Sequence, residues 1–369
     1  MRIGILSMQR VINYGSYLQA FALRQLLLRH GVDEVGFIDI KEGRHLRGNE
    51  TSGTRYALRR LRALAKVIIS GRLFAKRRTL AFMGNVRNVI MSAWSELGIK
   101  DNNNNDDNYD LAIIGSDEVF HCCQPSSWGY TPQLYGDIPE AKRVVSYAGS
   151  FGATKYEDLL RHGIGDEIAC NLKRLSHISV RDENSRSIVE RLTGRNPLIH
   201  IDPVLAYGFK NELEHCGSVD ESNYILVYSY PDRINSPKEI KAITSYAREH
   251  NKKLISVMSR YDWCDRAIIP TPLRLLAWFK HADAVITETF HGTIFSIITQ
   301  RQFVTIARKS SIPKLTSMLK PYGLNDRILR SPDDITKVFS ETVDYSAVNT
   351  RLNALRKETD EYIDLILKG

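Results

Sequence analysis

Residues 282–298, ADAVITETFHGTIFSII, decide the fold. The β-branched run at 284–287 predicts a buried strand, and the apolar run from about Gly292 to Gln300 predicts a helix directly after it. Strands that alternate with helices in this way build parallel sheets. The same succession recurs along the chain, with further strands predicted at residues 2–7, 35–40, 110–114, 143–147, 177–180, 199–201, 224–229, 253–258 and 303–306.

Helices are predicted between the strands and at the end of the chain, at residues 16–30, 236–250, 271–281, 312–322, 332–340 and 347–367. Ser16 is the expected cap of the first. The polar stretch 211–223 lacks an apolar rhythm and indicates a domain boundary near 202–223. We therefore expect an α/β fold of two doubly wound, Rossmann-like domains facing a cleft, formed by residues 1–205 and 206–369. We expect the first domain to carry a basic helical insertion at about 44–100. The last helix can either stay with the second domain or pack back on the first.

The net charge of +9 is concentrated in one segment. Residues 44–90 contain twelve Lys or Arg against one acid, Glu50, so the rest of the chain sums to about −2. Apolar residues recur between these cations at near-helical spacing, as in basic helices that lie on anionic membranes. A solvated charged face packed on the first domain is the other interpretation. Nucleic acid is not expected as a partner, because aromatic residues are not interleaved with the cations.

Several classes of protein are excluded by composition. No stretch approaches the roughly 18 uninterrupted apolar residues of a membrane span, and residues 1–7 predict a strand instead of a signal peptide. The 5 cysteines lack metal-ligand spacing. We expect a cytoplasmic protein, with the inner face of the membrane as an optional location, and an activity that needs no metal.

Polar residues that directly follow predicted strands mark the expected site, because open α/β sheets bind ligands at the carboxyl ends of their strands. No GxGxxG, P-loop or HExxH pattern supports a dinucleotide, Walker-type or zincin site. We expect catalytic roles for His291, Arg181 and Asp117. The residues expected to bind substrate are Asn13, Tyr14, Gly15, Ser116, Glu288, Gly292, Thr293 and Lys309.

Each catalytic candidate also has a simpler interpretation. His291 begins a helix, where free N–H groups and the helix dipole favour an anion such as phosphate, unless Glu288 satisfies it locally. Arg181 can hold a carboxylate or phosphate through two parallel hydrogen bonds, or pair at the surface with one of the two acids that follow it. Asp117 follows a tight turn that would project it into the cleft, or it caps a helix.

At these residues the sequence resembles the polysaccharide pyruvyl transferase family. The matching stretches are residues 4–6, 13–15, 18–23, 110–119, 146–152, 179–182, 202–205 and 282–298. The resemblance implies a fold similar to that of two-domain glycosyltransferases, phosphoenolpyruvate as donor substrate without a further cofactor, and a saccharide acceptor that is often lipid-linked. The product would be a cyclic pyruvate ketal on two sugar hydroxyls, commonly the 4 and 6 positions. The family often has Asp-Ser-Phe-His-Gly where this chain has Glu288 to Gly292, and Gln where it has Glu118.

The chemistry of ketal formation is compatible with these side chains. An enol phosphate must receive a proton on carbon, an acceptor hydroxyl must lose one, and phosphate must leave. We expect His291 to contact the phosphate and donate a proton, Arg181 to clamp the donor, and Asp117 to activate or orient a hydroxyl; Lys309 is a second candidate for the phosphate. The alternatives are a nucleotide-sugar glycosyltransferase of the same fold and a non-catalytic binder of anionic polymers.

Overall fold

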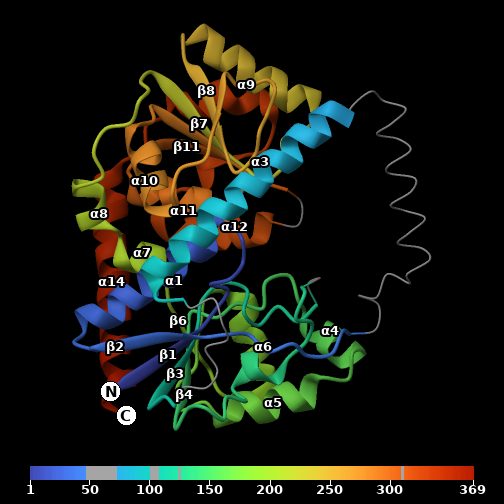
Figure 1. Ribbon diagram of the computed structural model, residues 1–369, viewed down its shortest axis with the longest axis vertical. Helices are drawn as coiled ribbons and strands as arrows, with labels where there is room; N and C mark the ends of the chain where they lie inside the picture. The colour runs from blue at the N-terminus through green and yellow to red at the C-terminus, as the bar shows by residue number, and fades with distance from the viewer. Residues whose placement is uncertain (47–72, 100–107, 124–125, 309–310) are drawn as a thin grey trace.

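The computed structural model describes residues 1–46, 73–99, 108–123, 126–308 and 311–369, which form two stacked α/β halves (Figure 1). The first half contains a parallel sheet in the order β2-β1-β3-β4. Its strands are β1 (Arg2–Leu6), β2 (Glu34–Ile38), β3 (Leu111–Gly115) and β4 (Val144–Tyr147). A small parallel pair, β5 (Ser179–Val180) and β6 (Leu198–Ile199), lies beside β4 through a bridge from Gly149 to Val180.

Alternate residues of the central strands cover opposite faces of this sheet. Ile3 and Ile5 of β1 belong to the core cluster that includes helix α1 (Tyr14–Arg29). Ala112 and Ile114 of β3 belong to a second cluster, with helices α5 (Gly165–Arg174) and α6 (Glu183–Thr193). The first sheet is therefore wound on both faces, as the strand–helix alternation predicts.

The second half contains a six-stranded parallel sheet in the order β12-β11-β10-β7-β8-β9. Its strands are β7 (Tyr224–Tyr228), β8 (Lys253–Val257), β9 (Arg266–Ile268), β10 (Ala284–Thr287), β11 (Gln302–Ile306) and β12 (Ile328–Leu329). The remaining helices are α3 (Leu73–Ser92), α4 (Tyr156–Arg161), α7 (Pro203–Tyr207), α8 (Lys210–Glu214), α9 (Pro237–Glu249), α10 (Pro272–His281), α11 (Phe290–Ile298), α12 (Ile312–Leu319), α13 (Ile335–Ser340) and α14 (Tyr345–Lys368).

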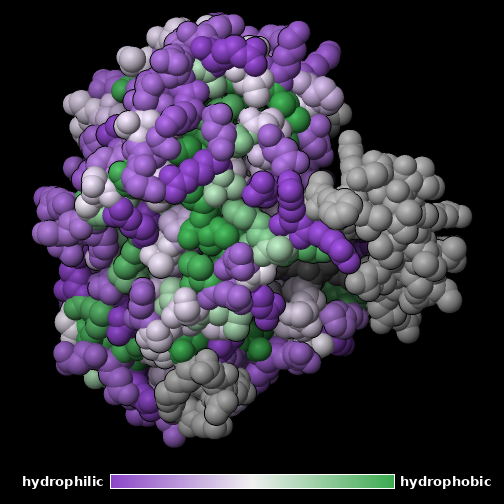
Figure 2. Space-filling view, turned by 45° about the horizontal axis from the view of Figure 1, so that its top comes forward, coloured by the Kyte–Doolittle hydropathy of each residue, from purple (hydrophilic) through white to green (hydrophobic). Residues whose placement is uncertain are grey.

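Apolar packing is continuous between the halves. One buried cluster extends from Ile5 in β1 through α1 to Val285 in β10, and the Tyr14 hydroxyl donates to the Pro270 carbonyl at 2.7 Å. Hydrophilic side chains cover much of the face in Figure 2, where hydrophobic ones gather near the middle.

The last helix returns to the first half. The chain termini lie close together in Figure 1 because α14 descends along both halves. The Tyr362 hydroxyl donates to the Ser146 carbonyl at 2.7 Å, and the Arg143 guanidinium donates to the Ile366 carbonyl at 2.7 Å. The end of α14 therefore lies against β4.

Several element boundaries differ from the sequence-based expectations. Helix α1 begins at Tyr14, two residues before the expected cap, because the extended Asn13 accepts a hydrogen bond from the Ser16 amide at 2.8 Å. Strands β9 and β12 were not predicted, since three and two residues are too short for a periodic signal. The polar stretch after the first half contains α8. Part of the basic insertion is helical in α3, and residues 47–72 lie outside the described part.

No helix among the described residues combines the length and the apolar character needed to cross a membrane.

Candidate active site

A cavity of about 1450 Å³ lies between the two halves and is lined by residues from both. In each sheet it opens where strand order reverses: between β1 and β3 in the first, and between β7 and β10 in the second. The loops after these four strands supply Asn13, Asp117, Tyr230 and Glu288 to the lining. These reversals are where doubly wound sheets bind ligands.

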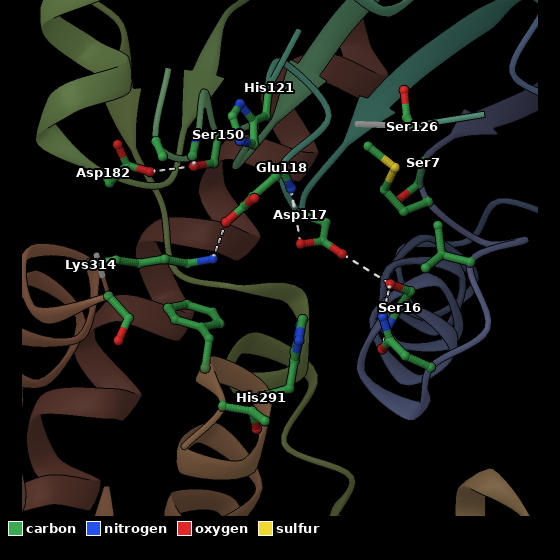
Figure 3. A pocket seen from close by; sticks show the side chains of 18 of the residues that line it. Ser7, Ser16, Asp117, Glu118, His121, Ser126, Ser150, Asp182, His291 and Lys314 are labelled. Carbon is green, nitrogen blue, oxygen red and sulfur yellow. Dashed lines mark hydrogen bonds and ion pairs between the residues drawn. The ribbon is translucent and has the colours of Figure 1, made fainter. Parts of the chain in front are cut away.

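Asp117 projects from a constrained turn after β3. Ser116 and Asp117 have φ values of 30° and 64°, in the left-handed region that non-glycine residues seldom occupy. One Asp117 oxygen accepts from Ser16 Oγ at 3.0 Å and the other from the Glu118 amide at 2.9 Å (Figure 3). The carboxylate thus ties the turn to α1 across the sheet reversal, and the helix-cap interpretation is wrong because no helix follows.

Arg181 lies directly behind the cavity wall. It donates to Asp202 Oδ2 at 2.9 Å, and Gln19 Nε2 donates to the same oxygen at 2.7 Å. Its guanidinium carbon is 4.5 Å from the centre of the Phe290 ring, and only 5% of the side chain is exposed. The surface-pair interpretation is wrong, because Asp182 caps α6 and Arg181 instead contacts a buried carboxylate.

His291 shares this buried carboxylate. Its Nε2 is 3.8 Å from Asp202 Oδ2, which is too long for a hydrogen bond. Glu288 does not satisfy it, since that carboxylate accepts from the Tyr230 amide at 3.0 Å and from Ser229 Oγ at 3.4 Å. Burial lowers the pKa of His291, although Asp202 and Asp117 oppose the shift, so the imidazole is neutral near pH 7.

Two buried nitrogen atoms remain without a hydrogen bond in this part of the described structure, one on the Arg181 guanidinium and the other His291 Nε2. Unpaired buried polar atoms are costly, and they often mark the place of an absent partner. Arg181 keeps its positive charge. Burial lowers its pKa, but the nearby carboxylates of Asp202 and Asp117 raise the pKa by more than burial lowers it.

Lys314 of α12 adds a second cation to the site, beside Arg181. Its Nζ lies 2.6 Å from Glu118 and 4.5 Å from the centre of the Phe290 ring (Figure 3). The contact joins the two halves across the cavity. Sequence analysis missed Lys314 because it lies within a helix and not directly after a strand. Lys309, the lysine singled out instead, lies outside the described residues.

The other predicted residues divide between the wall and what lies behind it. Asn13 and Glu288 line the cavity, whereas Tyr14, Ser116, Gly292 and Thr293 are buried behind it. Gly15 leaves room for the His291 imidazole, because a Cβ at position 15 would lie 2.3 Å from His291 Nδ1. Gly292 allows close packing, because its Cβ would lie 2.2 Å from Thr287 Oγ1.

A family model described as polysaccharide pyruvyl transferase matches residues 13–310, which include Asp117, Arg181 and His291. The chain belongs to the polysaccharide pyruvyl transferase family. It is therefore a transferase of polysaccharide biosynthesis. No curated protein matches its sequence.

Solved structures show the fold of this pyruvyl transferase. The UDP-GlcNAc 2-epimerase from Neisseria meningitidis, bound to UDP-GlcNAc, has a TM-score of 0.50 with 9% identity and full coverage, 100%, of both chains. A co-structure of S. aureus MnaA with UDP has a TM-score of 0.52 with 8% identity, covering 100% of this chain and 97% of that one. These likenesses confirm the expected pair of Rossmann-like domains in the arrangement of GT-B-like glycosyltransferases.

Within the described ranges, no group of three or more His, Cys, Asp or Glu side chains is placed to hold a metal ion.

Proposed function

We propose that this pyruvyl transferase moves the pyruvyl group of phosphoenolpyruvate onto two hydroxyls of a hexose, at positions 4 and 6, and releases phosphate. The acceptor is a cell-surface polysaccharide, such as a capsule or exopolysaccharide, or its lipid-linked precursor. The observation that carries the proposal is the pair of unpartnered buried nitrogens of Arg181 and His291 beside the cationic Lys314. A donor with a carboxylate and a phosphate offers anionic oxygens as acceptors for these nitrogens and for the lysine.

Each residue has a role that its surroundings permit. His291 and Lys314 line the cavity and contact the donor's anionic groups, while Arg181 holds the donor by its charge and its free nitrogen from behind Phe290. Asp117 accepts the proton of the acceptor hydroxyl. Burial raises the pKa of Asp117, but His291, Arg181 and Lys314 outweigh burial and lower it, so the carboxylate is ionised and able to act as a base.

The direct test is phosphate release from phosphoenolpyruvate across a panel of soluble and lipid-linked sugars. We expect Arg181→Ala and His291→Ala to lower kcat/KM by about 10²-fold or more, since each removes a group that holds the donor's anionic oxygens. Arg181→Lys and His291→Asn repeat the test with smaller disturbance of packing. Arg186→Ala is the matched control, because Arg186 pairs with Glu183 at the surface. Near-wild-type rates in Arg181→Ala or His291→Ala would overturn these roles.

The alternative function is nucleotide-sugar transfer, which the same fold can host. Release of a nucleoside diphosphate from a sugar nucleotide, without phosphate release from phosphoenolpyruvate, would favour that alternative.

A lipid-linked acceptor would bring the enzyme to the inner face of the membrane. The basic segment 44–90 is the proposed contact with anionic lipid. Its described part includes Arg77, Arg78 and Arg87, all exposed on α3.

A further inference from the structure

Glu288 is the carboxyl group at the sheet reversal of the second half. It follows β10, and the residues after the neighbouring β7 hold its Oε1 through the Tyr230 amide at 3.0 Å and Ser229 Oγ at 3.4 Å. The residue is 7% exposed and lines the cavity. Its Oε2 has no hydrogen-bond partner among the described residues. One oxygen is therefore fixed by the protein and the other is available to a bound molecule.

Glu288 and Asp117 line the same cavity from opposite halves. Burial raises the pKa of the Tyr230 phenol, and both Asp117 and Glu288 raise it further. Tyr230 lines the cavity with both carboxyl groups, and its amide donates to Glu288 Oε1 at 3.0 Å.

The pKa values of these two carboxyl groups are shifted in opposite directions by their surroundings. Asp117 lies 3.9 Å from the Arg181 guanidinium, whereas no cation in the described structure lies within ion-pair distance of Glu288. Burial raises the pKa of Glu288 more than the Tyr230 amide, Arg233 and Arg308 lower it. One cavity thus holds a carboxyl group whose pKa is lowered and another whose pKa is raised, and such a separation distinguishes a base from an acid in one site.

We propose that Glu288 is the general acid that protonates the methylene carbon of phosphoenolpyruvate, while Asp117 is the base for the attacking hydroxyl. This assignment rests on the proposed function. The Glu288 O–H bond breaks and a C–H bond forms with the π electrons of the enol, which leaves an oxocarbenium-like carbon and an ionised Glu288. The first hydroxyl oxygen bonds to that carbon and gives its proton to Asp117.

The later steps balance without another reactant. The bond from the central carbon to the phosphate oxygen breaks, and phosphate leaves with the electron pair. The second hydroxyl closes the ketal ring, and its proton leaves with phosphate. The proton on Asp117 returns through solvent to Glu288, so one hydroxyl proton in effect ends on the new methyl group and the enzyme is restored.

The test compares Glu288→Gln and Glu288→Asp with wild type in phosphate release and ketal formation. We expect Glu288→Gln to lower kcat by about 10²- to 10⁴-fold, with KM for phosphoenolpyruvate changed less than threefold. Wild-type kcat should fall as pH rises through the pKa of Glu288, and Glu288→Gln should lose this dependence. Glu288→Asp keeps the acid and should restore both the activity in part and the pH dependence.

Glu221→Gln is the matched control. Glu221 pairs with Lys253 at the amino ends of β7 and β8, away from the strand ends that form the cavity. Thermal melts and stabilisation by phosphoenolpyruvate check that each variant folds and binds its donor. A Glu288→Gln variant with kcat within threefold of wild type, or with a loss confined to KM, would overturn the assignment. If wild type itself releases no phosphate with any acceptor, the proposed function fails and this assignment fails with it.

Discussion

At the scale of single residues, the position of His291 depends on the absence of a side chain at Gly15. A Cβ on Gly15 would lie 2.3 Å from His291 Nδ1, well inside contact distance, so Gly15→Ala must displace the imidazole. We expect kcat to fall by about 10²-fold, the usual cost of misplacing a catalytic group by roughly 1 Å. Gly84→Ala is the control, because its Cβ would meet no atom within 4 Å on α3.

The control should gain about 0.5–1 kcal/mol of stability, as alanine does over glycine in an exposed helix. Steady-state kinetics of both variants measure the change in kcat, and urea unfolding measures the change in stability. Unchanged kcat in a folded Gly15→Ala variant would show that the imidazole position does not limit the reaction.

The residues of the site divided clearly into those that could be predicted and those that could not. Asp117, Arg181 and His291 were predicted because each follows a strand, and strand ends meet at one edge of a sheet. Asp202 was named only as the start of a family stretch and of the predicted domain boundary, yet its Oδ2 accepts from both Arg181 and Gln19. Lys314 meets Glu118 from 196 residues away. Such long-range contacts leave no local pattern in the sequence.

At the scale of elements, the alternation of strands and helices predicted sheets covered by helices on both faces. It did not predict which carboxyl or imidazole groups would be buried between the elements. His200 follows β6 and lies 4.5 Å, centre to centre, from the Tyr362 ring of α14, while its Nδ1 is 2.7 Å from Ser179 Oγ of β5. Burial lowers its pKa from 6.5 to about 4. The unfolded chain therefore binds a proton between these values that the folded chain does not.

The free energy of unfolding should accordingly decrease as pH falls from 6.5 towards about 4, by about 3 kcal/mol from this residue. His200→Asn removes the titrating group, so the variant should lose this part of the pH dependence while other groups titrate as in wild type. Urea unfolding at several pH values measures the difference. His215→Asn, at the exposed end of α8, should follow the wild-type curve. Parallel wild-type and His200→Asn curves would contradict the prediction.

Helix α3 offers a second test at this scale, of the proposed membrane contact. Replacing Arg77, Arg78 and Arg87 by Gln should weaken binding to anionic liposomes by about a hundredfold, at roughly 1 kcal/mol for each cation near the surface. The control replaces three exposed cations of α9, Lys238, Lys241 and Arg248, and should bind as wild type does. If co-sedimentation with liposomes does not change with their content of anionic lipid, α3 is instead a solvated, charged face.

At the scale of the whole molecule, the cavity depends on both halves at once. Asp117 and Glu118 come from the turn after β3 in the first half, and Lys314 and His291 come from the second half. A donor bound there should stabilise the fold as a unit, because ligand that binds only the folded chain raises the free energy of unfolding by about 2.7 kcal/mol at one hundred times its Kd. We expect this shift with phosphoenolpyruvate and not with nucleoside diphosphates.

Lys314→Ala should reduce the phosphoenolpyruvate shift, because it removes a cation that bridges the halves. Lys320→Ala, at an exposed position just after the same helix, should keep it. Thermal unfolding with increasing ligand measures all three proteins under one set of conditions. Since the same fold can carry either chemistry, the choice of ligand is decisive: stabilisation by a nucleoside diphosphate alone would indicate nucleotide-sugar transfer, whereas stabilisation by phosphoenolpyruvate that depends on Lys314 indicates pyruvyl transfer in the cavity between the two sheets.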